Sequence, residues 1–182
     1  MTGLGSKVVG LHLALDGATI PHAFGGALAL AFCTLRPRGT SDIDLNVFLS
    51  VAERDRFLTS LPREVTPTEE QRMLLERDGQ ARLFWDRTPI DVFLDTTHFH
   101  RGARLRIQWQ EFGGHLMPFL GCSDLAVFKA FFDRTKDWAD LEEMIAAGSL
   151  DRERVLGALV LYLGGSDPRI ERLRTLGPPG TR

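Results

Sequence analysis

The sequence predicts an α+β fold, with a mixed β-sheet, helices packed on that sheet and a helical C-terminal region. Short strand-like runs alternate with helical segments up to about residue 121, and beyond that point apolar residues recur only at helical spacing. The chain of 182 residues is long enough to bury one sizeable core. We therefore expect an α/β core over residues 1–121 and a helical region over residues 122–182, packed together as one compact unit.

The first elements follow from local sequence pattern. Residues 4–15 are dense in Val and Leu with few breakers, which indicates a helix. Residues 20–24 are a short apolar strand that stops at a Gly-Gly pair. The Ala- and Leu-rich run 27–35 is predicted to be a helix, which Pro37 ends. Strict alternation of polar and apolar residues makes residues 42–49 a strand.

The middle of the chain is predicted to contain two helices and a hairpin. A Ser N-cap begins a helix over residues 51–60, and a Thr-x-x-Gln capping box begins another over residues 68–78. The runs 80–85 and 88–94 are strand-like and are joined by two polar residues, Asp86-Arg87. This arrangement is typical of a β-hairpin.

The last elements comprise two more strands and then helices. Residues 104–109 and 115–120 are predicted strands on either side of a Gly-Gly pair. From Ser123 the spacing is helical up to Gly148, with an internal break. Helices over residues 151–163 and 167–175 complete the predicted order.

Composition excludes several classes of protein. An apolar fraction of 43% and a charged fraction of 25% are ordinary for a globular domain, and a net charge of −2 argues against broad nucleic-acid binding. No apolar run approaches a membrane span, and the N-terminus lacks the layout of a signal peptide. Cys33 and Cys122 lie in apolar surroundings without metal-type spacing, so we expect buried free thiols and a reducing compartment. A cytoplasmic protein is predicted.

Three acids stand out on the predicted strands. Alternation places Asp42 and Asp44 on one face of their strand, and Asp91 lies in a strand with the same acid-out pattern. If these strands pair, the three carboxylates converge. Such a site suits one or two Mg²⁺ ions about 3.5–4 Å apart, the arrangement used for in-line phosphoryl transfer. The alternative for each acid is a solvated strand face.

A Gly-Gly pair lies between the first strand and the helix that follows it. Gly25 and Gly26 allow a backbone to approach a phosphate closely, and a helix N-terminus presents free N–H groups. The alternative is an ordinary tight turn between strand and helix.

Together these motifs resemble the DNA polymerase beta-like nucleotidyltransferase superfamily, whose pattern is Gly-Gly, a helix, Asp-x-Asp on a strand and a third Asp on a neighbouring strand. The closer resemblance is to its abortive-infection, type IV toxin-like (AbiEii) branch. The matching segments are residues 25–30, 38–45, 124–129 and 134–141. Thr40 stands where that branch usually has Ser.

The resemblance implies a Mg²⁺-dependent nucleotidyltransferase that moves a nucleoside monophosphate from an NTP to an acceptor hydroxyl. Asp42 and Asp44 would bind metal, and Asp91 would be the third metal ligand or the general base. The implied nucleotide-binding residues are Gly25, Gly26, Arg38, Thr40 and Lys129. Asp137 and Asp140 are expected to orient the neighbouring basic residues Arg134, Lys136 and Lys129.

The acceptor stays open at the level of sequence. The resemblance allows RNA, notably the tRNA 3′ end, or a protein side chain in a toxin–antitoxin setting with an antitoxin partner. A small aminoglycoside-type acceptor is an alternative within the same chemistry. A non-catalytic nucleotide-binding relative and a helical interaction module are the competing classes.

The remaining polar and aromatic residues are predicted to have ordinary roles. The histidines expected on the surface or in loops are His22, His98, His100 and His115. The arginines expected on solvated faces, with an RNA-binding patch as the alternative, are Arg101, Arg104, Arg106, Arg169, Arg172 and Arg174. The tryptophans expected in or beside the core are Trp85, Trp109 and Trp138.

Overall fold

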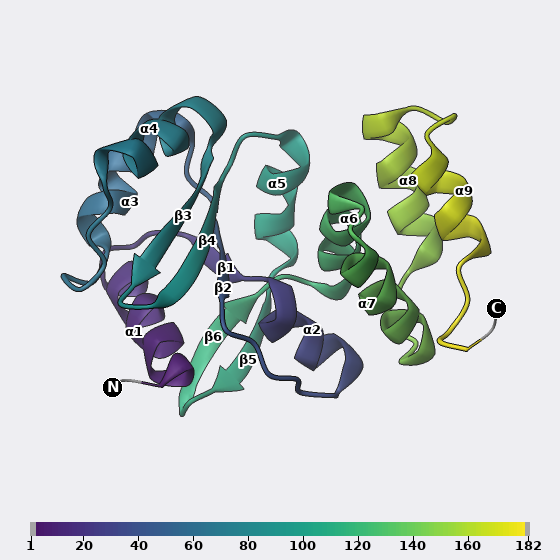
Figure 1. Ribbon diagram of the computed structural model, residues 1–182, viewed down its shortest axis with the longest axis horizontal. Helices are drawn as coiled ribbons and strands as arrows, with labels where there is room; N and C mark the ends of the chain where they lie inside the picture. The colour runs from purple at the N-terminus through teal and green to yellow at the C-terminus, as the bar shows by residue number, and fades with distance from the viewer. Residues whose placement is uncertain (1–2, 181–182) are drawn as a thin grey trace. The chain divides into compact units, whose positions relative to one another are not determined.

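The computed structural model describes residues 3–180, which fall into two compact units (Figure 1). The first unit contains the chain up to Leu28 together with Gly39–Leu120, and the second contains Ala29–Arg38 together with the chain from Gly121 onward. The first unit holds the whole sheet and the second is entirely helical apart from its loops. The predicted α+β class with a mixed sheet and a helical C-terminal region is confirmed.

The sheet of the first unit has six strands in the order β3-β4-β2-β1-β6-β5. The strands are β1 (His22–Phe24), β2 (Ile43–Val47), β3 (Gln80–Trp85), β4 (Thr88–Leu94), β5 (Gln108–Phe112) and β6 (His115–Phe119). The pairs β2–β4 and β1–β6 are parallel and the other three are antiparallel, so the sheet is mixed. β2 and β4 lie side by side, as the convergence of the three acids requires.

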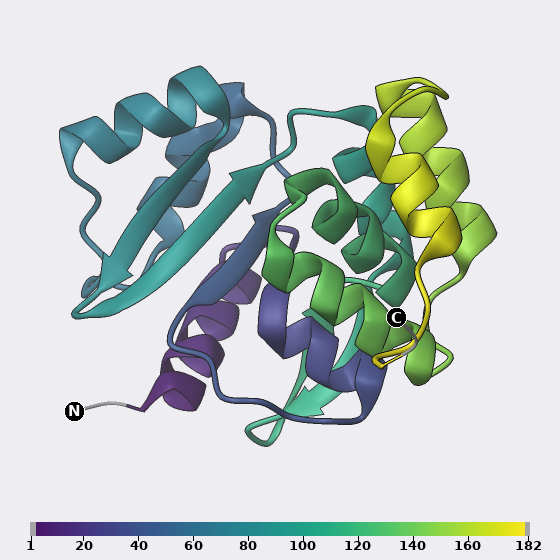
Figure 2. The same ribbon diagram turned by 45° about the vertical axis from the view of Figure 1, so that its right-hand side comes forward.

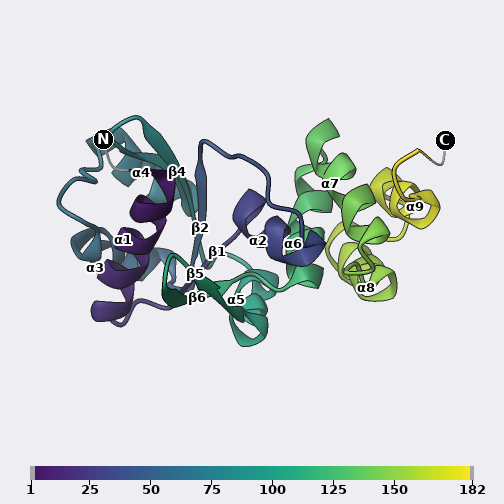
Figure 3. The same cartoon turned by 90° about the horizontal axis from the view of Figure 1, so that it is seen from below.

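The helices of the first unit cover the sheet and one of its edges. They are α1 (Leu4–Gly17), α3 (Arg54–Ser60), α4 (Glu69–Asp78) and α5 (His98–Ala103), with 3₁₀ turns at Val51–Glu53 and Arg104–Arg106. α1 and α3 lie on the same side of the sheet (Figure 3), and α4 runs beside β3 (Figure 2). Burial of Val8, Leu11 and Leu15 attaches α1 to the core, because removal of apolar area from water is the main force holding such a helix in place.

A buried lysine joins α1 to the β3–β4 turn. The Lys7 ammonium donates to the Trp85 carbonyl at 2.7 Å and to the Thr88 hydroxyl at 3.0 Å, and it lies 3.0 Å from an Asp86 carboxylate oxygen. The cost of burying the charge is thereby offset by three oxygen partners.

Up to residue 180 the second unit contains five helices, one of which it shares with the first unit. α2 (Gly26–Thr34) begins in the first unit and continues into the second, where α6 (Cys122–Phe132), α7 (Thr135–Ala146), α8 (Arg152–Leu163) and α9 (Pro168–Thr175) follow. Asp133 ends α6 in the left-handed conformation, which accounts for the predicted break. No helix among residues 3–180 combines the length and apolar character needed to span a membrane.

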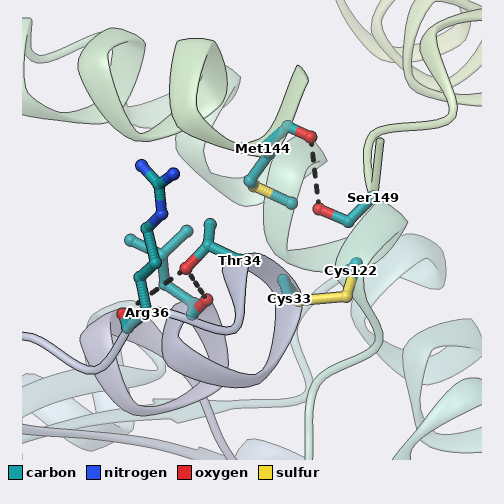
Figure 4. Close-up of a disulfide and its surroundings, with 7 residues drawn as sticks. Cys33, Thr34, Arg36, Cys122, Met144 and Ser149 are labelled. Atoms are coloured by element: carbon teal, nitrogen blue, oxygen red, sulfur yellow. Dashed lines mark hydrogen bonds between the residues drawn. A yellow bond between two sulfur atoms is a disulfide. The ribbon is translucent and has the colours of Figure 1, made fainter. Parts of the chain in front are cut away.

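A disulfide between Cys33 and Cys122 ties α2 to the first turn of α6 (Figure 4). The prediction of two free thiols is therefore wrong, and the argument for a reducing compartment that depended on it no longer holds. The two cysteines are 89 positions apart, so no local spacing reveals the pairing. The cytoplasmic location stays a prediction.

Four local predictions are corrected. Residues 104–106 form a 3₁₀ turn, and the strand predicted over 104–109 begins only at Gln108. α5 was not predicted, because its six residues are too few to show a helical period.

His22 and His100 are buried rather than on the surface, with side chains that hydrogen-bond to backbone carbonyls of Ile20 and Leu94. Trp109 is 51% exposed and is not a core residue.

Candidate active site

Two of the three predicted acids are direct neighbours in the sheet. In the parallel β2–β4 pair, Asp44 and Asp91 are Cα partners, and residues in register project from the same face. Asp42 lies two residues before Asp44, ahead of the first strand residue Ile43. The apolar residues that alternate with these acids are buried on the opposite side, so the sheet presents its carboxylates on one surface, here called the carboxylate face.

Gly26 lies in direct contact with the second acid. Its φ of +52° is left-handed, and a Cβ placed on it would overlap Asp44 Oδ2. The Gly25 N–H donates to the Asp44 backbone carbonyl at 2.9 Å. The strand-to-helix turn therefore requires glycine at position 26 twice over, for its backbone conformation and for the space that a carboxylate occupies.

Thr40 orients the first acid. Its hydroxyl donates to Asp42 Oδ1 at 2.5 Å, and both residues are half-buried. The hydroxyl hydrogen is therefore directed at the Asp42 carboxylate. Thr40 was predicted to contact a nucleotide phosphate, and that role stays a prediction.

The third acid is held by an arginine on the neighbouring edge strand. Arg82 Nε donates to Asp91 Oδ1 at 2.6 Å and Arg82 Nη2 donates to Asp91 Oδ2 at 2.7 Å, a bidentate pair. The two residues are Cα partners in the antiparallel β3–β4 pair. The hydrogen bonds to Asp91 raise the pKa of Arg82, and the charges of Asp42 and Asp44 raise that pKa further, so one guanidinium interacts with all three carboxylates.

The donor chemistry of this face fits a hard divalent cation. Within residues 3–180, no group of three or more His, Cys, Asp or Glu side chains stands close enough to hold a metal ion. Mg²⁺ needs fewer protein ligands than that, since one or two carboxylates with substrate phosphates and water usually complete its shell. Asp42 and Asp44 supply carboxylate oxygens of the right kind, while both oxygens of Asp91 accept hydrogen bonds from Arg82.

The two predicted cationic nucleotide ligands are paired within the second unit. Lys129 is buried, and its ammonium lies 2.5 Å from Asp140 Oδ2 and 3.6 Å from Asp137 Oδ1. Arg38 donates to both oxygens of Asp140, at 2.5 and 3.1 Å. The orienting role predicted for Asp137 and Asp140 agrees with these contacts, whereas nucleotide binding by Lys129 and Arg38 stays a prediction.

Sequence reasoning overlooked Arg82 even though the signal was present. Counting outward from the two-residue turn Asp86-Arg87 places Arg82 opposite Asp91. The buried pair of His12 and His22 was also overlooked, because 10 positions separate the two residues and only the packing of α1 against β1 brings them to 3.0 Å.

Comparison with known proteins gives a fold and no sequence family. No protein-family model matches the sequence, and neither does any curated protein. The chain is similar in structure to the antibiotic-resistance factor ANT(2'')-Ia crystallised in complex with adenylyl-2''-tobramycin, with a TM-score of 0.55, 13% identity and 95% of each chain covered. A solution structure of ANT(2'')-Ia gives a TM-score of 0.51 at 13% identity, over 93% of this chain and 88% of that one. The chain thus has a nucleotidyltransferase-like fold.

Proposed function

We propose that this protein is a Mg²⁺-dependent nucleotidyltransferase that moves a nucleoside monophosphate from an NTP to an acceptor hydroxyl. The observation that carries the proposal is the register of Asp44 with Asp91 on one sheet face, beside a glycine turn that touches the Asp44 carboxylate. A nucleotidyltransferase-like fold over 95% of the chain supports the same chemistry.

We propose the following roles for the acids and for the glycine pair. Asp42 and Asp44 would hold Mg²⁺, which when bound neutralises the triphosphate charge and favours in-line attack. Asp91 would complete the metal shell or accept the proton of the acceptor hydroxyl. Gly25 and Gly26 would bring backbone N–H groups at the start of α2 close to the phosphates.

We propose a small hydroxyl-bearing molecule of the aminoglycoside type as the acceptor. The support is the structural likeness to ANT(2'')-Ia, whose complex contains adenylyl-2''-tobramycin. A net charge of −2 agrees with it, because a large RNA acceptor usually requires a strongly basic surface. RNA or protein acceptors and an antitoxin partner depend on the motif resemblance alone.

The test is label transfer from α-labelled NTPs with Mg²⁺, offered tobramycin and other aminoglycosides, total RNA and total protein in separate reactions. We expect label on a small molecule.

The Asp42→Asn and Asp44→Asn variants should each lose at least about 100-fold in rate, since metal ions supply several kcal/mol of transition-state stabilisation. Asp55→Asn is the matched control, because this acid is 77% exposed and lies on α3. Undiminished transfer by both site variants would refute the proposal.

A non-catalytic nucleotide-binding protein is the second candidate. The specific observation in its favour is that Arg82 occupies both oxygens of Asp91. This candidate predicts that an NTP raises the melting temperature without Mg²⁺ and that no pyrophosphate is released. Pyrophosphate release that requires Mg²⁺ excludes it.

A further inference from the structure

We propose that Arg82 competes with the divalent cation for Asp91 and thereby sets the metal affinity of the site. The inference rests on the proposed function in one respect, which is that the carboxylate face binds a metal. Arg82 is then a positioning residue, because its contact with Asp91 controls whether this third carboxylate is available to the metal ion.

The geometry supports direct competition. Arg82 uses two nitrogens to engage both Asp91 oxygens, at 2.6 and 2.7 Å, which leaves neither oxygen without a cationic partner. A metal ion that approaches Asp91 must share these oxygens with the guanidinium or displace it, and the positive charge of Arg82 opposes its binding in either case. Arg82 also interacts electrostatically with Asp42 and Asp44, so its charge opposes the arrival of another cation at either acid.

The Arg82 side of the pair is accessible to water. The Arg82 side chain is 55% exposed and the Asp91 side chain 21% exposed. Exposed ion pairs are weak because water solvates the separated charges and side-chain entropy is regained on release. Among the described residues β3 is the terminal strand of the sheet, so Arg82 has a neighbouring strand on one side only.

The buried ion pairs of the second unit provide the contrast. The Asp137 and Asp140 side chains are 1% exposed, and removing a partner there would leave a buried charge unpaired. The Arg82–Asp91 pair lies at the carboxylate face and its guanidinium is half exposed to water, so releasing Arg82 does not strand a buried charge as it would in the second unit.

The experiment is a double-mutant cycle on Mn²⁺ affinity, measured in the absence of nucleotide by titration calorimetry and by electron paramagnetic resonance of free Mn²⁺. Arg82→Gln should raise the Mn²⁺ affinity about fivefold or more, because the Arg82–Asp91 pair opposes metal binding by a modest free energy. Asp91→Asn alone should change the affinity little, because Arg82 already occupies this carboxylate. In the Arg82→Gln background the same Asp91→Asn change should lower the affinity by a larger factor than in the parent, and part of the gain should remain because Asp42 and Asp44 no longer face the Arg82 charge.

Arg77→Gln is the matched control. Arg77 makes the same bidentate contact with Asp78, at 2.8 and 2.6 Å, on α4 and outside the carboxylate face. Its loss should leave Mn²⁺ affinity unchanged. Circular dichroism of every variant checks that the fold is retained, and Arg82→Lys, which keeps the charge without the fork, should give an intermediate affinity.

Each outcome separates this inference from the proposed function. An Arg82→Gln variant that binds Mn²⁺ no more tightly than the parent, or an Asp91→Asn effect that is equal in both backgrounds, overturns the role of Arg82 even if nucleotide transfer is observed. A cycle with the expected coupling but without transfer in any variant supports Arg82 as the competitor and refutes the enzymatic proposal.

Discussion

At the scale of single residues, the glycine at position 26 and the position of the Asp44 carboxylate depend on each other. The backbone of residue 26 turns in the left-handed region, and the Asp44 carboxylate lies in the space that a side chain would need. A glycine here is therefore a requirement of the candidate site as well as of the turn. The acid and the glycine pair must be considered together when variants are designed.

We predict that Gly26→Ala abolishes nucleotide transfer and lowers the free energy of unfolding by about 2–4 kcal/mol, the sum of a left-handed backbone penalty and a displaced carboxylate. Gly148→Ala is the control, since Gly148 also has a positive φ, +68°, but has no atom within 4 Å of the position that a Cβ would take. It should cost only about 1 kcal/mol. Denaturant unfolding and label transfer measure both effects. Equal costs for the two variants would contradict the contact with Asp44.

At the scale of elements, the disulfide fixes α2 against α6 within the second unit. It closes a loop between Cys33 and Cys122, which are separated by 89 positions of sequence. Beside it, the Ser149 hydroxyl donates to the Met144 carbonyl at 3.3 Å (Figure 4). The Thr34 hydroxyl donates to the Leu30 carbonyl at 2.9 Å. Cross-linking positions so far apart restricts the unfolded chain strongly.

We predict that replacing both Cys33 and Cys122 by Ser lowers the free energy of unfolding by about 2–5 kcal/mol. Dithiothreitol should destabilise the parent protein by a similar amount and leave the double variant unaffected, which serves as the control. Thermal unfolding with and without reductant measures the difference. Thiol titration of the denatured, unreduced protein should find no free thiol, and two titratable thiols would contradict the bond.

At the scale of the whole molecule, a buried histidine pair predicts how stability responds to acid. The Ile20 carbonyl can only accept, so His22 donates to it from Nδ1 at 2.8 Å, and neutral His22 then accepts at Nε2 from His12 Nδ1 at 3.0 Å. Burial, with a smaller contribution from the charge of His12, lowers the pKa of His22 to about 4 against opposing contributions from the Ile20 carbonyl and Asp16. Burial also lowers the pKa of His12.

The lowered pKa of His22 determines whether stability rises or falls with pH. Above pH 6.5 His22 is neutral in both the folded and the unfolded chain, so its contribution is constant. Between pH 6.5 and about 4 only the unfolded chain takes up the proton, so stability falls as pH falls. We predict a loss near pH 4 of about 3 kcal/mol attributable to His22, which His22→Gln should remove. Urea unfolding at about pH 7 and about pH 4.5 tests this, with the exposed His98→Gln as control. If the stability of His22→Gln fell with pH as steeply as that of the parent protein, the prediction would be contradicted.

Much of the fold could be predicted because its signals are local. The Asp86-Arg87 turn indicated the hairpin, and Thr68 with Gln71 indicated the start of α4, where the capping box is present. The strand order, the disulfide and the burial of His22 depend on contacts between distant segments, which no local pattern encodes. The three acids could be named from alternation, but the state of Asp91 depends on its cross-strand neighbour Arg82.

The parallel pairing of β2 with β4 has a consequence for biogenesis. Asp44 and Asp91 meet only after the helices and the strand between them have been synthesised and folded back, because parallel neighbours require a crossover connection. A ribosome-bound chain that has emerged only through β3 therefore carries Asp42, Asp44 and Arg82 but lacks Asp91. The carboxylate face is therefore complete only after β4, which ends at Leu94 of the 182 residues, has been made and has paired with β2.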